Sequence, residues 1–533
     1  METTSTLRWT GPVASIAYDT KGINARLQSL DRPCYAVRNG HGLGLTNAGS
    51  LAPRGADGFE LAASAPPLTA RQLGDAGFRE TYGLTYAYMT GSMANAIASE
   101  AMVTALGQAG MLGAFGSGGL TPDRLEAAIR YVQQALPDGP YAFNLIHSPN
   151  EPALERAAVD LYLKHEVPVI EASAYLRLTP HVVRYRAAGL SLGSGGRVEI
   201  GNRIIAKLSR REVARRFMAP APDAMLRDLV AGGAITSEQA ELAAQVPMAD
   251  DVTVEGDSGG HTDRRPLVCL LPSLIALRDE LQAEYQFDTP VRVGAAGGLG
   301  TPAAVLGAFM MGAAYVVTGS INHASVESGT SPAVKALLAE AEATDVMMAP
   351  AADMFEMGVK LQVLKRGTLF PMRARKLYEL YETYEGIDDI PPDERKKLET
   401  RVLQRGFDDV WEDCVTFFEA RDPRQIERAR DNPKRKMALI FRWYLGLATH
   451  WAIGGVKERR MDYQIWCGPA MGAFNDWARG SSLEDPAERH VVAMARALMT
   501  GAARQYRTQH LQMQGIELAS AGQPVPLTKG ATA

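Results

Sequence analysis

The chain has 533 residues, 46% of them hydrophobic, which is enough to build a large core. Its formal net charge of −4 is small for this length and argues against a dedicated nucleic-acid binder. No stretch of about 18 apolar residues occurs, and the N-terminal sequence METTSTLRWTG lacks the basic start and apolar run of a signal peptide.

The cysteine pattern, like the lack of a recognisable signal peptide, is that expected of a cytoplasmic protein. The four cysteines form no CxxC pair, so neither a disulfide framework nor a zinc site is expected. We therefore expect a cytoplasmic protein with free thiols, no metal and no membrane span. The cysteines are Cys34, Cys269, Cys414 and Cys467.

Residues 1–80 are rich in glycine and proline and suggest a loop-rich N-terminal extension. From about Tyr82 onward, strand-like runs alternate with amphipathic stretches such as Asn95–Ala109, Pro122–Ala135 and Pro152–Lys164. This alternation predicts a parallel sheet, and eight strands match a closed (β/α)₈ TIM barrel. A doubly wound open sheet is the alternative. The candidate strands are Tyr86–Met89, Leu112–Phe115, Tyr141–Ile146, Val169–Ala172, Ile204–Leu208, Val252–Glu255, Val291–Ala295 and Tyr315–Thr318.

Two regions depart from the simple alternation. A helical insertion is expected at about residues 210–250, where Ala221–Ala244 reads as one or two helices; above a barrel mouth it would form a lid or a substrate wall. Beyond the barrel, which is expected over residues 81–385, a helical C-terminal region covers 386–515 and a disordered tail 516–533. The aromatics Phe441, Trp443 and Tyr444 in this region suggest the face of a homodimer.

Three strand-like runs end in glycine-rich loops, within Val252–His261, Val291–Gly298 and Tyr315–Ser320. Glycine lets backbone N–H groups approach a phosphate closely, and the last two loops of a barrel build phosphate sites in many enzymes. The alternative is a pair of tight turns without a ligand. The spacing fits neither GxGxxG nor a P-loop. The candidate phosphate-binding residues are Gly297, Gly298, Gly319 and Ser320.

His261 follows Gly259-Gly260 directly after a strand, where it can serve as a proton donor. A polar loop histidine is the equally weighted alternative. Lys207 lies in an otherwise apolar strand, so it needs a partner or a ligand unless it reaches solvent from the strand end.

Asn144 is a lone amide in an apolar strand and must find hydrogen bonds, either to a heterocyclic ring or to neighbouring backbone. Weaker strand-end candidates are Met89, Thr90, Gly91, Glu171 and Ser173. Seven basic residues of the C-terminal helices suggest a solvated face, or a dock for an acidic carrier protein. They are Lys434, Arg435, Lys436, Arg442, Lys457, Arg459 and Arg460.

Seven stretches together resemble the nitronate monooxygenase-like flavin barrels and, more narrowly, the PfaD-type trans-acting enoyl reductases of polyunsaturated fatty acid and trans-acyltransferase polyketide synthases. The likeness runs from about Phe78 to Gln509. Two positions depart from the family pattern: Gly256 stands where alanine is usual, and His323 where glutamine is usual. The stretches are Phe143–Pro149, Glu171–Ala174, Ala206–Arg210, Asp257–Asp263, Ala349–Gly358, Met437–Gly446 and Asp462–Gly472.

The resemblance implies FMN at the barrel mouth, NADPH as electron source and an enoyl thioester on an acyl carrier protein as substrate. It implies that His261 donates the proton or polarises the carbonyl, and that Lys207 stabilises the negative charge of the reduced flavin. Two other functions compete: a flavin oxidase or monooxygenase acting on nitronates, and an inactive scaffold within a synthase complex. The residues that would hold the cofactor are Met89, Thr90, Gly91, Asn144, Glu171, Ser173, Lys207, Gly259, Gly260, Gly297, Gly298, Gly319 and Ser320.

Overall fold

The computed structural model describes residues 7–147 and 152–518. Its centre is a closed barrel of eight parallel strands, so the open-sheet alternative is wrong. The barrel closes where Val316 of the last strand pairs with Tyr88 of the first. Each strand lies within two residues of its predicted position. The strands are β6 (Tyr88–Thr90), β7 (Leu112–Phe115), β8 (Ala142–Ile146), β9 (Val169–Ser173), β12 (Arg203–Leu208), β13 (Asp251–Glu255), β15 (Arg292–Ala296) and β16 (Val316–Thr318).

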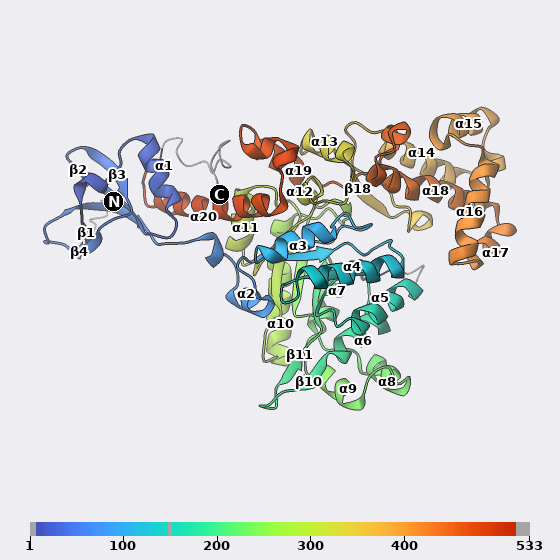
Figure 1. Ribbon diagram of the computed structural model, residues 1–533, viewed down its shortest axis with the longest axis horizontal. Helices are drawn as coiled ribbons and strands as arrows, with labels where there is room; N and C mark the ends of the chain where they lie inside the picture. Colours follow the sequence, from blue (N-terminus) through green and yellow to red (C-terminus); the bar gives the residue numbers. More distant parts are fainter. Residues whose placement is uncertain (1–6, 148–151, 519–533) are drawn as a thin grey trace.

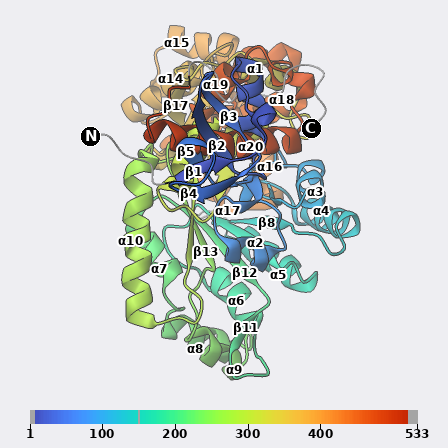
Figure 2. The same ribbon diagram turned by 90° about the vertical axis from the view of Figure 1, so that its left-hand side faces the viewer.

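Helices connect the strands around the outside of the barrel (Figures 1 and 2). Several begin with a threonine cap followed by proline, which satisfies and pre-shapes the first turn. The first helix starts at Glu100 rather than Asn95, because Asn95 is left-handed (φ 57°) and Ser99 caps the helix. The helices are α3 (Glu100–Gln108), α4 (Pro122–Ala135), α5 (Pro152–Lys164), α6 (Pro180–Ala188), α7 (Arg211–Met218), α10 (Leu267–Tyr285) and α11 (Pro302–Met310).

The predicted insertion forms two helices, α8 (Asp223–Ala231) and α9 (Ser237–Ala243), but it does not lie above the mouth. Helix α7, which follows β12, runs back along the outside of the barrel, so the chain is at the amino-terminal end of the barrel when the insertion begins. There α9 packs on the hairpin of β10 (Leu190–Leu192) and β11 (Val198–Ile200). Figure 1 shows α8 and α9 at the end of the molecule opposite α18 and α19. The lid or substrate wall predicted here is therefore wrong.

The N-terminal segment is a folded sheet rather than a loop-rich extension. Five antiparallel strands pair in the order β3-β2-β5-β1-β4. Trp9 is fully buried in its core, and α2 (Ala76–Tyr82) then connects the sheet to the barrel. This sheet is hard to recognise in the sequence, because its strands are short and are separated by glycine turns. Its elements are β1 (Leu7–Thr10), α1 (Thr20–Gln28), β2 (Cys34–Asn39), β3 (Gly42–Thr46), β4 (Ser50–Pro53) and β5 (Phe59–Ala65).

Helix α20 (Val491–Met513) joins the N-terminal sheet to the barrel. It packs against α11 on one side and β5 on the other. Its fully buried Arg507 donates hydrogen bonds to backbone carbonyls of the N-terminal segment, among them Ser29 at 2.6 Å and Arg32 at 2.5 Å. Of the predicted tail, Ile516 is buried beside this sheet, and residues 519–533 lie outside the described residues.

The C-terminal region holds a second apolar core beside the barrel mouth. Phe441 and Tyr444 are fully buried inside it, so they do not form the predicted dimer face. No helix within 7–147 or 152–518 is long and apolar enough to cross a membrane. The remaining elements are α12 (Ser320–His323), α13 (Pro332–Ala339), β14 (Gly260–His261), β17 (Val346–Pro350), β18 (Lys360–Leu364), α14 (Phe370–Thr383), α15 (Pro392–Lys397), α16 (Phe407–Arg421), α17 (Arg424–Arg430), α18 (Pro433–Gly454) and α19 (Ala470–Ala478).

Candidate functional site

A cavity of about 870 Å³ lies at the carboxyl ends of the barrel strands. Residues of β17, β18 and the segment between them form part of its wall, together with Trp466 and Ala470. Most of the residues predicted from the sequence meet around this one space. Those that line it are Gly91, Asn144, Ser173, Lys207, Gly259, Gly260, His261, Gly297, Gly298, Gly319 and Ser320.

Three of the predicted residues are not among those that line the cavity. Met89 is fully buried in the apolar core inside the barrel. The hydroxyl of Thr90 accepts a hydrogen bond from the amide of Asn322 at 2.8 Å. The buried carboxylate of Glu171 accepts hydrogen bonds from the backbone N–H of Ser92 at 2.9 Å and from its hydroxyl. All three side chains therefore make their contacts within the protein, next to the residues that line the cavity.

The loop that carries His261 is held in place by a small sheet. Gly260 pairs with Gln362 of β18, and the Gln362 amide donates to Asp257 and to the Ser258 carbonyl, both at 2.8 Å. A Cβ at Gly259 would lie 2.8 Å from the backbone nitrogen of Cys467, so only glycine fits there. The position of His261 therefore depends on Gln362 and Cys467, which lie about 100 and 200 positions later in the chain.

His261 forms an ion pair with Asp353, with Nε2 and Oδ1 3.2 Å apart. Burial disfavours the charged imidazole, but the hydrogen bond and negative charge of Asp353 outweigh it, so the pKa of His261 is raised. Burial raises the pKa of Asp353, but the hydrogen bond and the charge of His261, with smaller contributions that include the charge of Arg442, together lower it below its usual value. The His261 side chain is 38% exposed, which leaves it accessible from the cavity.

Lys207 reaches a carboxylate rather than open solvent. Its Nζ lies 3.5 Å from Glu255 Oε1, and each side chain is 18% exposed. Burial alone would lower the pKa of Lys207, but the charges of Glu255 and Glu171 raise it. Burial raises the pKa of Glu171, against the opposing charge of Lys207. A cation is thus held inside the cavity by two acids, one on each neighbouring strand.

Asn144 uses both of its amide protons within the protein. Its Nδ2 donates to the carbonyl of Glu171 at 3.0 Å and to the hydroxyl of Ser173 at 2.8 Å. This is the structural alternative considered for Asn144. Its oxygen is the atom left to accept a hydrogen bond from a ligand.

The two glycine turns leave room for an anionic group. Gly297 and Gly298 have φ values of +85° and +76°, which favour glycine. Nothing lies within 4 Å of the position that a Cβ would take at Gly298 or Gly319, and both residues line the cavity. The hydroxyl of Ser320 accepts from Gly468 N at 2.9 Å and keeps its own proton to donate. The backbone here fits a phosphate.

Sequence reasoning missed the residues that partner the predicted ones. Glu255 ends the strand before the loop that carries His261, and Asp353 lies in the Ala349–Gly358 stretch. Both residues therefore stood in segments that had been singled out, but the sequence did not indicate that they pair with Lys207 and His261. Gln362 gave no local signal, because its contact with the loop joins distant parts of the chain. Within the described ranges, no cluster of three or more metal-ligating side chains occurs.

The seven basic residues near the C-terminus do not form one free face. Arg459 is buried and donates to the carbonyl of Val402 at 2.8 Å, and Arg442 pairs with Glu356 at 3.2 Å. Lys434 donates to the carbonyl of Tyr384 at 2.7 Å. These contacts stabilise the C-terminal core, so the prediction of a single solvated face is wrong for these three.

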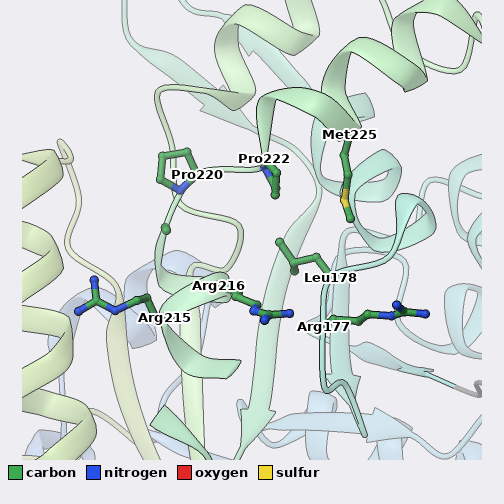
Figure 3. A pocket seen from close by; sticks show the side chains of 8 residues that line it. Arg177, Leu178, Arg215, Arg216, Pro220, Pro222 and Met225 are labelled. Atoms are coloured by element: carbon green, nitrogen blue, oxygen red, sulfur yellow. The ribbon is translucent and has the colours of Figure 1, made fainter. Parts of the chain in front are cut away.

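A second cavity, of about 350 Å³, lies between α7, α8 and the loop that precedes α6 (Figure 3). Its wall is mainly apolar, with Leu178, Pro222 and Met225 around it. Figure 3 shows Arg216 extending across it, whereas Arg215 points away, toward the carboxylate of Glu280 on α10 with which it pairs. None of the residues predicted for the site lines this cavity.

Three family profiles match consecutive parts of the chain. The profile of nitronate monooxygenase matches residues 81–383, which contain the barrel. The profile of the fatty acid synthase subunit PfaD N-terminal domain matches residues 9–67, which form the N-terminal sheet. The inserted helical domain of acyl-carrier-protein S-malonyltransferase matches residues 384–463, within the C-terminal core.

Relatives from polyunsaturated fatty acid and polyketide synthases share about half of their aligned residues with this chain. One of the polyunsaturated fatty acid synthase subunits of Thraustochytrium sp. is 49% identical over 89% of the chain, which spans 31% of that protein. Polyketide biosynthesis protein PksE of Bacillus subtilis is 48% identical over 81% of the chain, which spans 56% of that protein. The chain thus spans only part of the length of these relatives.

One solved structure is close in both sequence and fold. The enoyl reductase domain of MlnA, from the macrolactin biosynthesis cluster of Bacillus amyloliquefaciens, is 40% identical with a TM-score of 0.80. The match covers 83% of this chain and 99% of that domain. The chain therefore belongs to the nitronate monooxygenase family and, within it, to the PfaD-type enoyl reductases.

Proposed function

We propose that the protein is an FMN-dependent enoyl reductase that uses NADPH to saturate enoyl thioesters carried on an acyl carrier protein. The pathway would be polyketide or polyunsaturated fatty acid synthesis. The observation that carries the proposal is the single cavity in which Lys207, His261 and the two glycine turns meet. Its volume suits a cofactor together with the reacting end of a substrate.

The residues present fit FMN. Gly297, Gly298, Gly319 and Ser320 would hold the phosphate, and Asn144 would accept a hydrogen bond from the ring. When bound, FMN supplies hydride transfer from NADPH to the β-carbon of the enoyl group. The ammonium of Lys207 would offset negative charge that develops beside it.

His261 would supply the proton, or the hydrogen bond to the carbonyl, that the substrate needs after hydride addition. The thioester carbonyl then gains enolate character, and the α-carbon needs a proton. The raised pKa of His261 keeps more of it protonated near neutral pH, as a proton donor or a hydrogen-bond donor to the carbonyl requires. Asp353 would hold the imidazole and stabilise its charge.

The decisive experiment follows the flavin spectrum without oxygen. Protein reconstituted with FMN is reduced with NADPH and then mixed with an enoyl thioester on a carrier protein. We expect NADPH to bleach the oxidised band, the thioester to restore it, and mass spectrometry to find the saturated product. Bleaching without restoration would reject the enoyl substrate. Oxygen uptake with a nitronate and no response to NADPH would favour the oxidase, and failure to bind FMN would favour the scaffold.

Replacing Asp353 with asparagine should shift the pH dependence of the thioester step. Without the carboxylate the pKa of His261 falls, so the imidazole loses its proton at a lower pH. We expect the rate to fall by up to about five-fold in mildly alkaline buffer and to recover below about pH 6, because exposed ion pairs contribute little. NMR titration of His261 checks the same shift. Asp388→Asn, at a carboxylate that is 94% exposed, is the matched control, and an unchanged profile in Asp353→Asn would contradict the role given to the pair.

A further inference from the structure

His323 lies at the wall of the cavity with one ring nitrogen unpaired. It is 3% exposed, and its Nδ1 lies 3.1 Å from the carbonyl oxygen of Trp466. Its Nε2 is buried without a hydrogen-bond partner among the described residues. His323 also lines the cavity, so its ring lies beside any ligand that fills this space.

The contact with Trp466 fixes which nitrogen carries the proton. A carbonyl oxygen only accepts hydrogen bonds, so Nδ1 must be the donor. Burial lowers the pKa of His323 to about 4, so the ring is neutral near neutral pH. Nε2 is then a bare acceptor, and a buried acceptor without a donor is costly.

The acceptor character of Nε2 restricts what can face it. Phosphate oxygens carry lone pairs of their own and would repel it. Ser320 and Gly319, the proposed phosphate residues, lie within the same single turn of helix α12 and its cap. The part of FMN next to the phosphate is a polyol chain, whose hydroxyls are hydrogen-bond donors.

We propose that Nε2 of His323 accepts a hydrogen bond from a hydroxyl of the polyol chain of FMN. The proposal rests on the FMN site proposed above. It makes His323 a binding residue that offers a neutral acceptor of fixed orientation.

The test is a binding cycle that needs no turnover. Dissociation constants are measured by flavin fluorescence for FMN and for its three single-deoxy polyol analogues, with the wild-type chain and with His323→Leu. We expect one analogue to bind the wild type about ten-fold more weakly than FMN does, and the variant to bind both equally. Any loss from the freed Trp466 carbonyl affects both ligands and cancels. His323→Gln should retain FMN affinity within about three-fold, because its amide oxygen also accepts.

Nitrogen-15 NMR of labelled histidine gives a second readout. We expect Nδ1 to be the protonated nitrogen and the Nε2 resonance to shift when FMN is added; His323→Gln identifies the signal. His450→Leu, at an exposed histidine, is the control. If the wild type binds FMN but all analogues bind equally well, only the role of His323 falls. If the wild type binds no FMN, the cofactor proposal falls as well.

Discussion

Replacing His261 with alanine is expected to slow oxidation of the reduced flavin by the enoyl thioester by about 10²- to 10⁴-fold, the usual contribution of a positioned general acid. Reduction by NADPH should proceed at the wild-type rate, since His261 is assigned only to the carbonyl and α-carbon. Anaerobic stopped-flow spectroscopy separates the two half-reactions.

Two comparisons make this result interpretable. His450→Ala removes an exposed histidine and should leave both half-reactions unchanged. Equal slowing of both half-reactions in His261→Ala would point instead to a displaced loop, because β14 pairs with β18 at this residue. An unaffected thioester step would remove His261 from the chemistry altogether.

Replacing Lys207 with methionine is expected to lower the free energy of unfolding by about 2–3 kcal/mol, somewhat less than for a fully buried pair. It leaves Glu255 and the fully buried Glu171 without their cation. The loss should shrink as the pH falls, because the pKa of Glu171 is already raised by burial and the acid can become neutral by taking up a proton. Urea denaturation over a range of pH measures both effects.

A double-mutant cycle assigns this loss to the charges. Adding Glu255→Gln to Lys207→Met should recover part of the lost stability, since one unpaired charge disappears. Lys397→Met, in an exposed pair with Glu394, should change stability by less than about 0.5 kcal/mol. If the double variant is as unstable as the sum of the single ones, the ion pair is not the cause. The same variants titrated with FMN show whether the charge also supports the cofactor.

The barrel was predictable because its strands are buried on both faces. Runs such as Ile204–Leu208 stand out as apolar, and the helices between them carry caps and a regular spacing. The antiparallel N-terminal sheet was not, since strands such as Ser50–Pro53 are short and largely exposed. The insertion was recognised but misplaced, because the helix α7 that precedes it was not separated from it; a connection between a barrel helix and the next strand lies at the amino-terminal end.

The candidate site, like the fold, was predictable only where the information is local in the sequence. Residues near the end of a barrel strand or in the loop after it, such as Lys207 and His261, could be grouped because parallel strands share one mouth. Their partners depended on tertiary structure: Asp353 reaches His261 from the connection between β17 and β18, and Trp466 meets His323 from 143 residues later in the chain. A pattern of strands carries no information about such contacts.

Helix α20 has a consequence for biosynthesis of the chain. The apolar face of the N-terminal sheet, with Cys34 and Ala63, is covered by Leu511 and Ile516. On the ribosome that face stays uncovered until roughly 450 further residues are made, about 20 to 90 s at ordinary rates of elongation. During this interval the uncovered face would be open to chaperones, or to the α20 of a neighbouring nascent chain. Exchange of α20 between copies would then produce swapped dimers without any new interface.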